Sequence, residues 1–146
     1  MDKGSPSIVV ACDGSVQSLS AAKMGAELAE ATGHPLRLLT VYPASKESVL
    51  VISGVEHNEI EAGKQQHSRK VFDAAKDAIG GRTDATEEIL LSGDPAHEII
   101  EYMNAHPGTH LVLGRRGHSL VRSLTLGSVS EKIVRHVHGA VTVVGQ

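Results

Sequence analysis

Short apolar runs alternate along the chain with longer segments whose apolar residues recur at helical spacing. The runs, which are rich in Val, Ile and Leu and bounded by turn residues, span residues 8–12, 36–41, 89–91, 111–113 and 140–144. Because they are mostly continuous rather than interrupted by polar residues, they predict strands that are buried on both faces of a parallel sheet.

Four helical segments are predicted between these five strands. Gly33-His34-Pro35 ends the first, Gly80-Gly81 the second and Pro107-Gly108 the third, while the fourth carries Val129, Ile133 and Val137. The order βαβαβαβαβ predicts an α/β fold: a single open five-stranded parallel sheet with right-handed crossovers and helices on both faces. We expect residues 1–146 to form one domain. Residues 43–57 are expected to be the one long irregular connection, either a lid or a mobile loop.

Ligands of such sheets bind at the carboxyl ends of the strands, where the strand order reverses. Three segments are therefore expected to converge there: residues 11–15, residues 41–43 and the turn that begins at Gly114.

The turn after the fourth predicted strand is rich in glycine. Gly114 and Gly117 lack a Cβ, so that successive N–H groups can face a phosphate closely. Arg115 and Arg116 lie between them and add positive charge that would help to hold a polyphosphate. Gly127 opens the last predicted helix, whose free N–H groups and positive dipole end favour an anion.

The start of this last helix has a second interpretation. Ser128-Val129-Ser130-Glu131 matches a capping box, which would begin a helix without any ligand. Similarly, Asp13 suits a ribose hydroxyl or a metal-bound water, but it could also be a turn residue that caps the first helix. Spacing alone does not separate phosphate binding from ordinary turn and cap chemistry.

Composition narrows the function classes. The chain has 17 acidic residues against 14 Lys plus Arg and only 2% aromatic residues, which argues against general binding of nucleic acids. The charge is uneven: from Gly114 onward there are five basic residues and one acid (+4), so the first 113 residues carry nine against sixteen (−7). A positive C-terminal part favours a local anion site over a polyanion track.

Several familiar sites are not indicated. Neither G-x-x-x-x-G-K-[ST] nor G-x-G-x-x-G follows the first strand, which argues against a conventional P-loop NTPase or dinucleotide dehydrogenase. Cys12 is the single cysteine and is expected to be a small buried residue, and the nine histidines show no metal-ligand spacing. With no signal peptide or membrane-spanning segment expected, we predict a cytoplasmic protein.

The glycine spacing is also that of a known family. Gly114-x2-Gly117-x9-Gly127-Ser128 resembles the G-2x-G-9x-G-[S/T] signature of ATP-binding universal stress proteins. The first run, which ends in Cys12-Asp13-Gly14-Ser15, resembles the family's V-D-G-S strand end, and residues 140–144 resemble its closing P-V-L-V-V strand. This resemblance covers nearly the whole chain, and it implies a Rossmann-like fold of the adenine-nucleotide α-hydrolase type.

The resemblance implies roles for the matching positions. The residues that would contact the ribose and triphosphate of ATP are Gly114, Gly117, Gly127, Ser128, Val129 and Ser130. Asp13 would lie beside the nucleoside, and the backbone of Ala11 and Val41 near the adenine. ADP or AMP could replace ATP, with Mg or Mn bound through the phosphates. A homodimer that pairs through the last strand is also implied, and that uncharged strand would need cover if it is an edge.

The sequence departs from the family pattern at two places, and three functions are compatible with it. Arg115 replaces the family's small hydroxyl residue, so it holds the triphosphate more tightly or bends the loop differently, and His138-Gly139-Ala140 replaces a C-P pair. The protein is expected to be an ATP-binding regulator of stress responses that acts on an unknown protein partner. The alternatives are a slow ATPase or nucleotide-transferring enzyme, for which Asp13 or His118 could act in catalysis, and a purely structural dimeric module.

Overall fold

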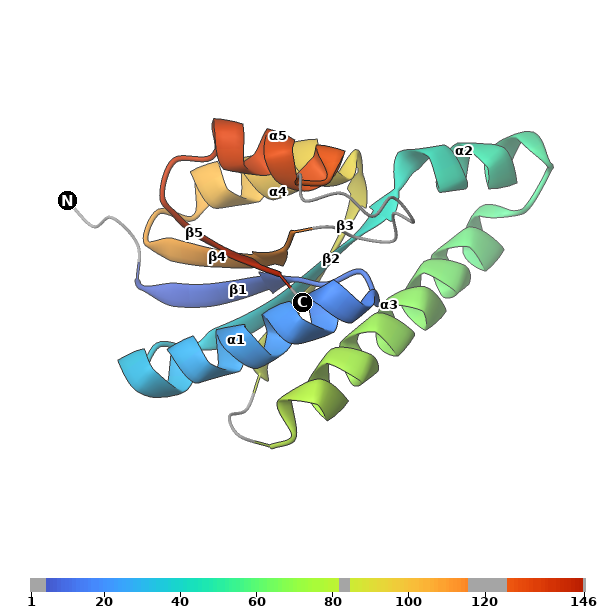
Figure 1. Cartoon of the computed structure of the whole chain (residues 1–146). Coiled ribbons are helices and arrows are strands. Elements are labelled where there is room, and N and C mark those ends of the chain that lie inside the picture. Colours follow the sequence, from blue (N-terminus) through green and yellow to red (C-terminus); the bar gives the residue numbers. More distant parts are fainter. Residues whose placement is uncertain (1–4, 82–84, 116–125, 146) are drawn as a thin grey trace.

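The computed structural model describes residues 5–81, 85–115 and 126–145 (Figure 1). In chain order its elements are β1 (Ser7–Ala11), α1 (Val16–Thr32), β2 (Leu36–Pro43), α2 (Ala44–Ile52), α3 (His57–Ile79), β3 (Ala85–Gly93), α4 (Pro95–Ala105), β4 (Thr109–Gly114), α5 (Ser128–His136) and β5 (Ala140–Val144). The five strands form one sheet in the order β3-β2-β1-β4-β5, and all neighbouring strands are parallel.

Helices cover both faces of the sheet, so the predicted three-layer α/β fold is confirmed (Figure 1). Helices α1 and α3 pack on one face, and α4 and α5 on the other. Successive residues of a strand point to opposite faces. In β1, Val10 accordingly packs with the α1 and α3 side and Val9 with the α4 side, and neither is exposed to solvent. This explains why the strand appears in the sequence as a continuous apolar run.

Helix α1 packs closely on the sheet because its buried face is built from small residues. These are Ser18, Ala21, Ala22, Gly25, Ala26 and Ala29. A Cβ at Gly25 would stand 2.3 Å from Cγ2 of Val10, so only glycine fits there without movement. The helix begins at Ser15, whose hydroxyl accepts from the Ser18 N–H, and it ends at Gly33 in the left-handed conformation.

The expectation of an irregular connection over residues 43–57 was wrong, because residues 44–52 form helix α2. None of the residues of α2 is buried, and Val49, Val51 and Ile52 are exposed, so the segment has no apolar stripe of the kind that marks a packed helix. Strand β3 is also longer than the predicted residues 89–91. Within the described part of the chain it is an edge strand that pairs only with β2, and its first half carries charged side chains such as Glu87 and Glu88.

Candidate functional site

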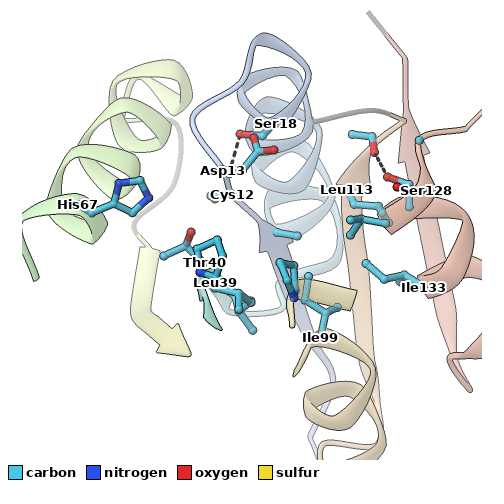
Figure 2. A pocket seen from close by; sticks show the side chains of 18 of the residues that line it. Cys12, Asp13, Ser18, Leu39, Thr40, His67, Ile99, Leu113, Ser128 and Ile133 are labelled. Carbon is cyan, nitrogen blue, oxygen red and sulfur yellow. Dashed lines mark hydrogen bonds between the residues drawn. The ribbon is translucent and has the colours of Figure 1, made fainter. Parts of the chain in front are cut away.

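A cavity of about 440 Å³ opens at the carboxyl edge of the sheet (Figure 2). It lies at the centre of the sheet, where β1 is flanked by β2 and β4. The chain connections that follow these strands run toward opposite edges of the sheet at this point. Its lining comes from β1, β2 and β4 and from all five helices: Ala11, Cys12, Asp13, Ser18, Leu39, Thr40, Val41, Pro43, Lys46, His67, Pro95, Ile99, Leu113, Gly114, Gly127, Ser128, Val129, Ser130 and Ile133. A volume of this size is typical of a small-molecule site.

Strand β2 extends past β1 at this edge. The pairing of β1 with β2 ends at Ala11 and Leu39, whereas β2 and β3 stay paired as far as Pro43 and Gly93. Beyond Leu39 no β1 residue is paired with β2, and this part of β2 includes Thr40 and Val41, which line the cavity. Backbone donors and acceptors along such an overhang are available to a ligand.

The turn between β1 and α1 is held by three local hydrogen bonds. Oδ1 of Asp13 accepts from the Ser15 N–H at 2.9 Å, and the Ser18 hydroxyl accepts from the Asp13 N–H at 3.2 Å. The Ser15 hydroxyl accepts from the Ser18 N–H, so Ser15 caps α1 and the alternative that Asp13 is the cap was wrong. This network fixes the Asp13 carboxylate in the lining of the cavity.

The opposite wall is the start of α5. Gly127 precedes the helix without any side-chain cap, so the capping-box interpretation was wrong. The Ser130 hydroxyl instead donates to the Gly114 carbonyl at 2.9 Å, which ties α5 to the end of β4. The Arg115 N–H donates to the Val144 carbonyl at 2.9 Å, and the Arg115 carbonyl accepts from the Gly127 N–H at the same distance. The first turn of α5 is thus anchored to both β4 and β5.

Eight of the eleven residues that the sequence singled out line this one cavity: Ala11, Asp13, Val41, Gly114, Gly127, Ser128, Val129 and Ser130. Arg115 does not line it, and its Nε atom is buried without a hydrogen-bond partner in the described part of the chain. Arg116 and Gly117, like His118, lie outside the described residues.

Sequence reasoning missed the polar lining on the α1 and α3 side of the sheet. Thr40 interrupts the otherwise apolar end of β2, and that polar interruption was the signal for it. His67 lies four residues before Val71, on the continuation of the apolar stripe of α3, which is a weaker signal. Lys46 belongs to α2, which was not expected to be a helix.

The pKa values of Cys12, which lines the cavity, and of Lys64, which belongs to α3, are displaced from their ordinary values. Burial, together with the nearby Asp13 carboxylate, raises the pKa of the Cys12 thiol to about 12, so this thiol is protonated and unreactive at neutral pH. Burial lowers the pKa of Lys64, but its hydrogen bonds to Glu47 and Glu61 outweigh that effect and raise the pKa. The Nζ atom of Lys64 lies 3.0 Å from Glu47 and 3.2 Å from Glu61, which ties α2 to α3.

Two other kinds of feature, a metal-ligand cluster and a membrane-spanning helix, are absent from the described residues. In residues 5–81, 85–115 and 126–145, no three His, Cys, Asp or Glu side chains are grouped as metal ligands. In the same ranges no helix is both long and apolar enough to cross a membrane.

The fold and the position of the cavity agree with the protein family that the sequence matches. Residues 5–145 match the universal stress protein family, and the chain belongs to it. Universal stress protein YxiE of Bacillus subtilis is 30% identical over 132 residues, which are 86% of this chain and 89% of YxiE.

Two solved structures have the same fold. A universal stress protein in complex with cAMP has a TM-score of 0.63 at 25% identity, covering 96% of both chains. The universal stress protein from Archaeoglobus fulgidus in complex with dAMP has a TM-score of 0.68 at 20% identity, covering 95% of this chain and 97% of the other.

Proposed function

We propose that this universal stress protein binds an adenine nucleotide at the carboxyl edge of its sheet and acts as a regulator in the stress response. The observation that carries the proposal is that one cavity is lined by the ends of β1, β2 and β4 and by the first turn of α5. The nucleotides named for the two related structures, cAMP and dAMP, support the same ligand class. We propose ATP as the ligand, with ADP or AMP as the alternatives, and residues 1–146 as one nucleotide-binding domain.

The phosphates would lie against the first turn of α5. Gly127, Ser128 and Val129 line the cavity there, and no side chain caps the helix, so its first N–H groups are available to an anion. Arg115 follows Gly114 directly, and its buried Nε has no acceptor among the described residues. To contact a phosphate, the guanidinium of Arg115 would have to turn toward the cavity, and no hydrogen bond at Nε among the described residues opposes that movement. Arg116 and Gly117 would complete this contact as the glycine signature implies.

The nucleoside would lie between Asp13 and the overhanging part of β2. Asp13 is the one carboxylate among the described residues that line the cavity, and it suits a ribose hydroxyl. The adenine would meet the backbone of Ala11 and Val41 between the aliphatic side chains of Leu39 and Ile99. Aliphatic walls suit a chain with a single Phe, two Tyr and no Trp.

The residues also fit a divalent ion that arrives with the nucleotide. Mg²⁺ or Mn²⁺ would be held mainly by the phosphates, and Asp13 could bind one of its waters. Such an ion would neutralise phosphate charge. The protein would contribute the positioning of Asp13, which the hydrogen bonds to Ser15 and Ser18 provide.

The alternative of a slow ATPase or nucleotide-transferring enzyme remains for the same site. Asp13 is then the described residue that could position a water or a second substrate. ATP turnover by the wild-type chain, lost in Asp13→Ala while ATP binding persists, would favour the enzyme. Binding without turnover would favour the regulator, which we propose to be cytoplasmic and to act on a protein partner that recognises the bound state.

Titration calorimetry with ATP and Mg²⁺, on the wild-type chain and Gly127→Val, tests the proposal. Gly127 has φ −64° and ψ 158°, a conformation that valine also adopts, so the substitution changes the cavity wall and not the backbone. We expect at least a 10-fold weaker affinity, because the new side chain would stand where the phosphates approach. Gly63→Val is the control, since a Cβ at this helical glycine meets nothing within 4 Å. Unchanged affinity in Gly127→Val would contradict the phosphate site, and absence of binding in the wild type would overturn the whole proposal.

We also propose that the chain forms a homodimer through β5. This strand is an edge of the sheet, paired only with β4 among the residues that the structure describes, and its side chains carry no charge. Val143 is 37% exposed, so a partner strand would cover it. Sedimentation velocity at micromolar concentration should give a dimer for the wild type and a monomer for Val143→Lys. A monomeric wild type would contradict this pairing.

A further inference from the structure

Helix α2 carries apolar side chains on the side that faces solvent. Val49 and Val51 are 62% and 59% exposed, and Ile52 is 85% exposed. These are three of the seven large apolar side chains that are exposed in the described part of the chain, although α2 has only nine residues. Apolar side chains that gather at one place on a surface commonly mark an interaction site.

The residues of α2 divide into two sides. At about 100° per residue, one arc of about 160° around the helix axis holds six residues and no charged one. These residues, which we call the outer face of α2, are Ala44, Ser45, Ser48, Val49, Val51 and Ile52. The other three residues of the helix, Lys46, Glu47 and Leu50, point to the opposite side.

This opposite side of α2 is held to the protein mainly by charged groups. Nζ of Lys46 lies 5.8 Å from the centroid of the buried Tyr42 ring. The Glu47 carboxylate lies 3.0 Å from Nζ of Lys64 in α3, and Leu50 is half-buried. The helix therefore turns its charges toward the protein and its apolar outer face toward solvent, which is the reverse of an ordinary surface helix. Such a reversal leaves the outer face available to a partner.

The surface next to the outer face is acidic. Residues 44–64 contain four acidic residues and two basic ones, which gives 2 − 4 = −2: Glu47, Glu56, Glu59 and Glu61 against Lys46 and Lys64. Glu56 and Glu59 are exposed at the start of α3, which lies with α2 at one end of the molecule (Figure 1). Among the described residues, Glu47 also lines an open hollow of about 410 Å³ together with Val51 and Ile52. A partner that covers the outer face therefore meets a negative rim, which favours basic residues around the partner's apolar ones.

We infer that the outer face of α2 is a docking surface for a protein partner that presents an amphipathic helix, apolar on one side and flanked by Lys or Arg. The negative rim disfavours two other occupants, a second copy of the same face and an anionic membrane. The inference rests on the proposed regulatory function for its role, because it supplies the surface that the partner contacts. Pro43 and Lys46, at the start of α2, line the cavity, so a ligand there would contact the same helix.

Fluorescence anisotropy with a labelled synthetic peptide tests this surface. The probe is a helical peptide of leucine and lysine, with leucines at positions i, i+3, i+4 and i+7 and lysines elsewhere. The control peptide has glutamate in place of every lysine. We expect the full chain to bind the lysine peptide at least about 10-fold more tightly than the glutamate peptide.

Matched variants of the chain place the binding on α2. Val49→Ser/Ile52→Ser should bind the lysine peptide at least about 10-fold more weakly, because two apolar side chains are then no longer available for burial. Val16→Ser is the control, since Val16 at the start of α1 is 60% exposed, and its substitution should leave the affinity unchanged. Glu56→Gln/Glu59→Gln should weaken binding about 3- to 10-fold at low salt and less at high salt. Val49→Ser/Ile52→Ser should unfold at the same urea concentration as the wild type, which excludes a folding defect.

Four results would overturn the docking surface. Two are equal binding of both peptides and unchanged binding by Val49→Ser/Ile52→Ser. The third is an assembly in sedimentation velocity that this variant alone loses, which would make a second copy the occupant. The fourth is binding to vesicles of phosphatidylcholine and phosphatidylserine that the variant loses, which would make it a membrane. If ATP binds in the calorimetry described above but the lysine peptide does not, the docking surface is wrong and the nucleotide site stands. If the peptide binds through α2 but ATP does not, the nucleotide site is wrong and the docking surface stands.

Discussion

Gly25 tests the packing that brings α1 against the sheet beneath the candidate site. A Cβ built on Gly25 lies 2.3 Å from Cγ2 of Val10, and Val10 is fully buried near the carboxyl end of β1. Ordinary contacts of a Cβ begin at 3.4 Å, so the two atoms would have to separate by 3.4 − 2.3 = 1.1 Å. Gly25→Ala must therefore shift the helix or force Val10 out of its rotamer.

Two opposing effects set the size of the change in stability. Alanine favours a helix over glycine by about 1 kcal/mol. Overpacking of a core costs about 1–3 kcal/mol, and a required movement of more than 1 Å places Gly25→Ala in the upper half of that range. The net result should be a loss of about 1–2 kcal/mol in the free energy of unfolding. Gly63→Ala, a glycine within α3 whose Cβ would meet nothing within 4 Å, should instead gain about 0.5–1 kcal/mol.

Urea denaturation followed by far-ultraviolet circular dichroism measures both variants against the wild type. The double variant Val10→Ala/Gly25→Ala removes Cγ2 as well, and with it the clash. Its loss in the free energy of unfolding should therefore be smaller than the sum of the two single-variant losses by at least about 1 kcal/mol. If Gly25→Ala gains stability as Gly63→Ala does, α1 is not in close contact with β1 and this account of the packing is refuted.

Three further predictions concern charged and reactive groups. Lys64→Met should speed hydrogen exchange of the backbone amides of α2 by at least about 10-fold, because the tie from Glu47 to α3 is lost; unchanged exchange would show that α2 is held otherwise. Hydrogen bonds from Arg69, and then Lys76, lower the pKa of Glu88 from 4.5 to about 2. The contribution of Glu88 to stability is therefore present above pH 4.5 and lost as the pH falls toward 2. The destabilisation caused by Glu88→Gln should shrink over that interval in urea titrations. A difference in unfolding free energy that does not change with pH would disprove the pairing. Cys12, with its pKa of about 12, should react with iodoacetamide at pH 8 at least about 100-fold more slowly in the native protein than in urea, as mass spectrometry can measure; equal rates would contradict its burial.

The sequence predicted those parts of the fold that have a periodic apolar signal. The five strands, the helices α1, α3, α4 and α5, and the parallel sheet all followed from continuous apolar runs and helical stripes. Helix α2 could not be found in this way, because it buries no side chain and its Val49, Val51 and Ile52 are exposed. A helix that packs so little has no stripe to detect.

The candidate site was predictable where its residues stand next to the end of a strand or the start of a helix. Gly114, Gly127 and Asp13 stand at strand ends and turns, and they converge on the cavity as strand ends of a parallel sheet must. Thr40 and His67 could not be assigned from spacing. Whether a threonine in a strand points at a helix or into a cavity depends on where the neighbouring strand stops, and that is decided by tertiary packing.

The two backbone hydrogen bonds of Arg115 join the candidate phosphate wall to the edge of the sheet. Through Arg115, Gly127 at the start of α5 is connected within one residue to Val144 at the end of β5. Anything that shifts Gly127 therefore also acts on the edge strand. If two chains pair along β5, cavity occupancy and subunit pairing become thermodynamically linked. If the bound nucleotide raises the affinity of the two chains for each other by some factor, dimerisation raises the affinity for the nucleotide by the same factor. Protein concentration would set the nucleotide level at which the site fills.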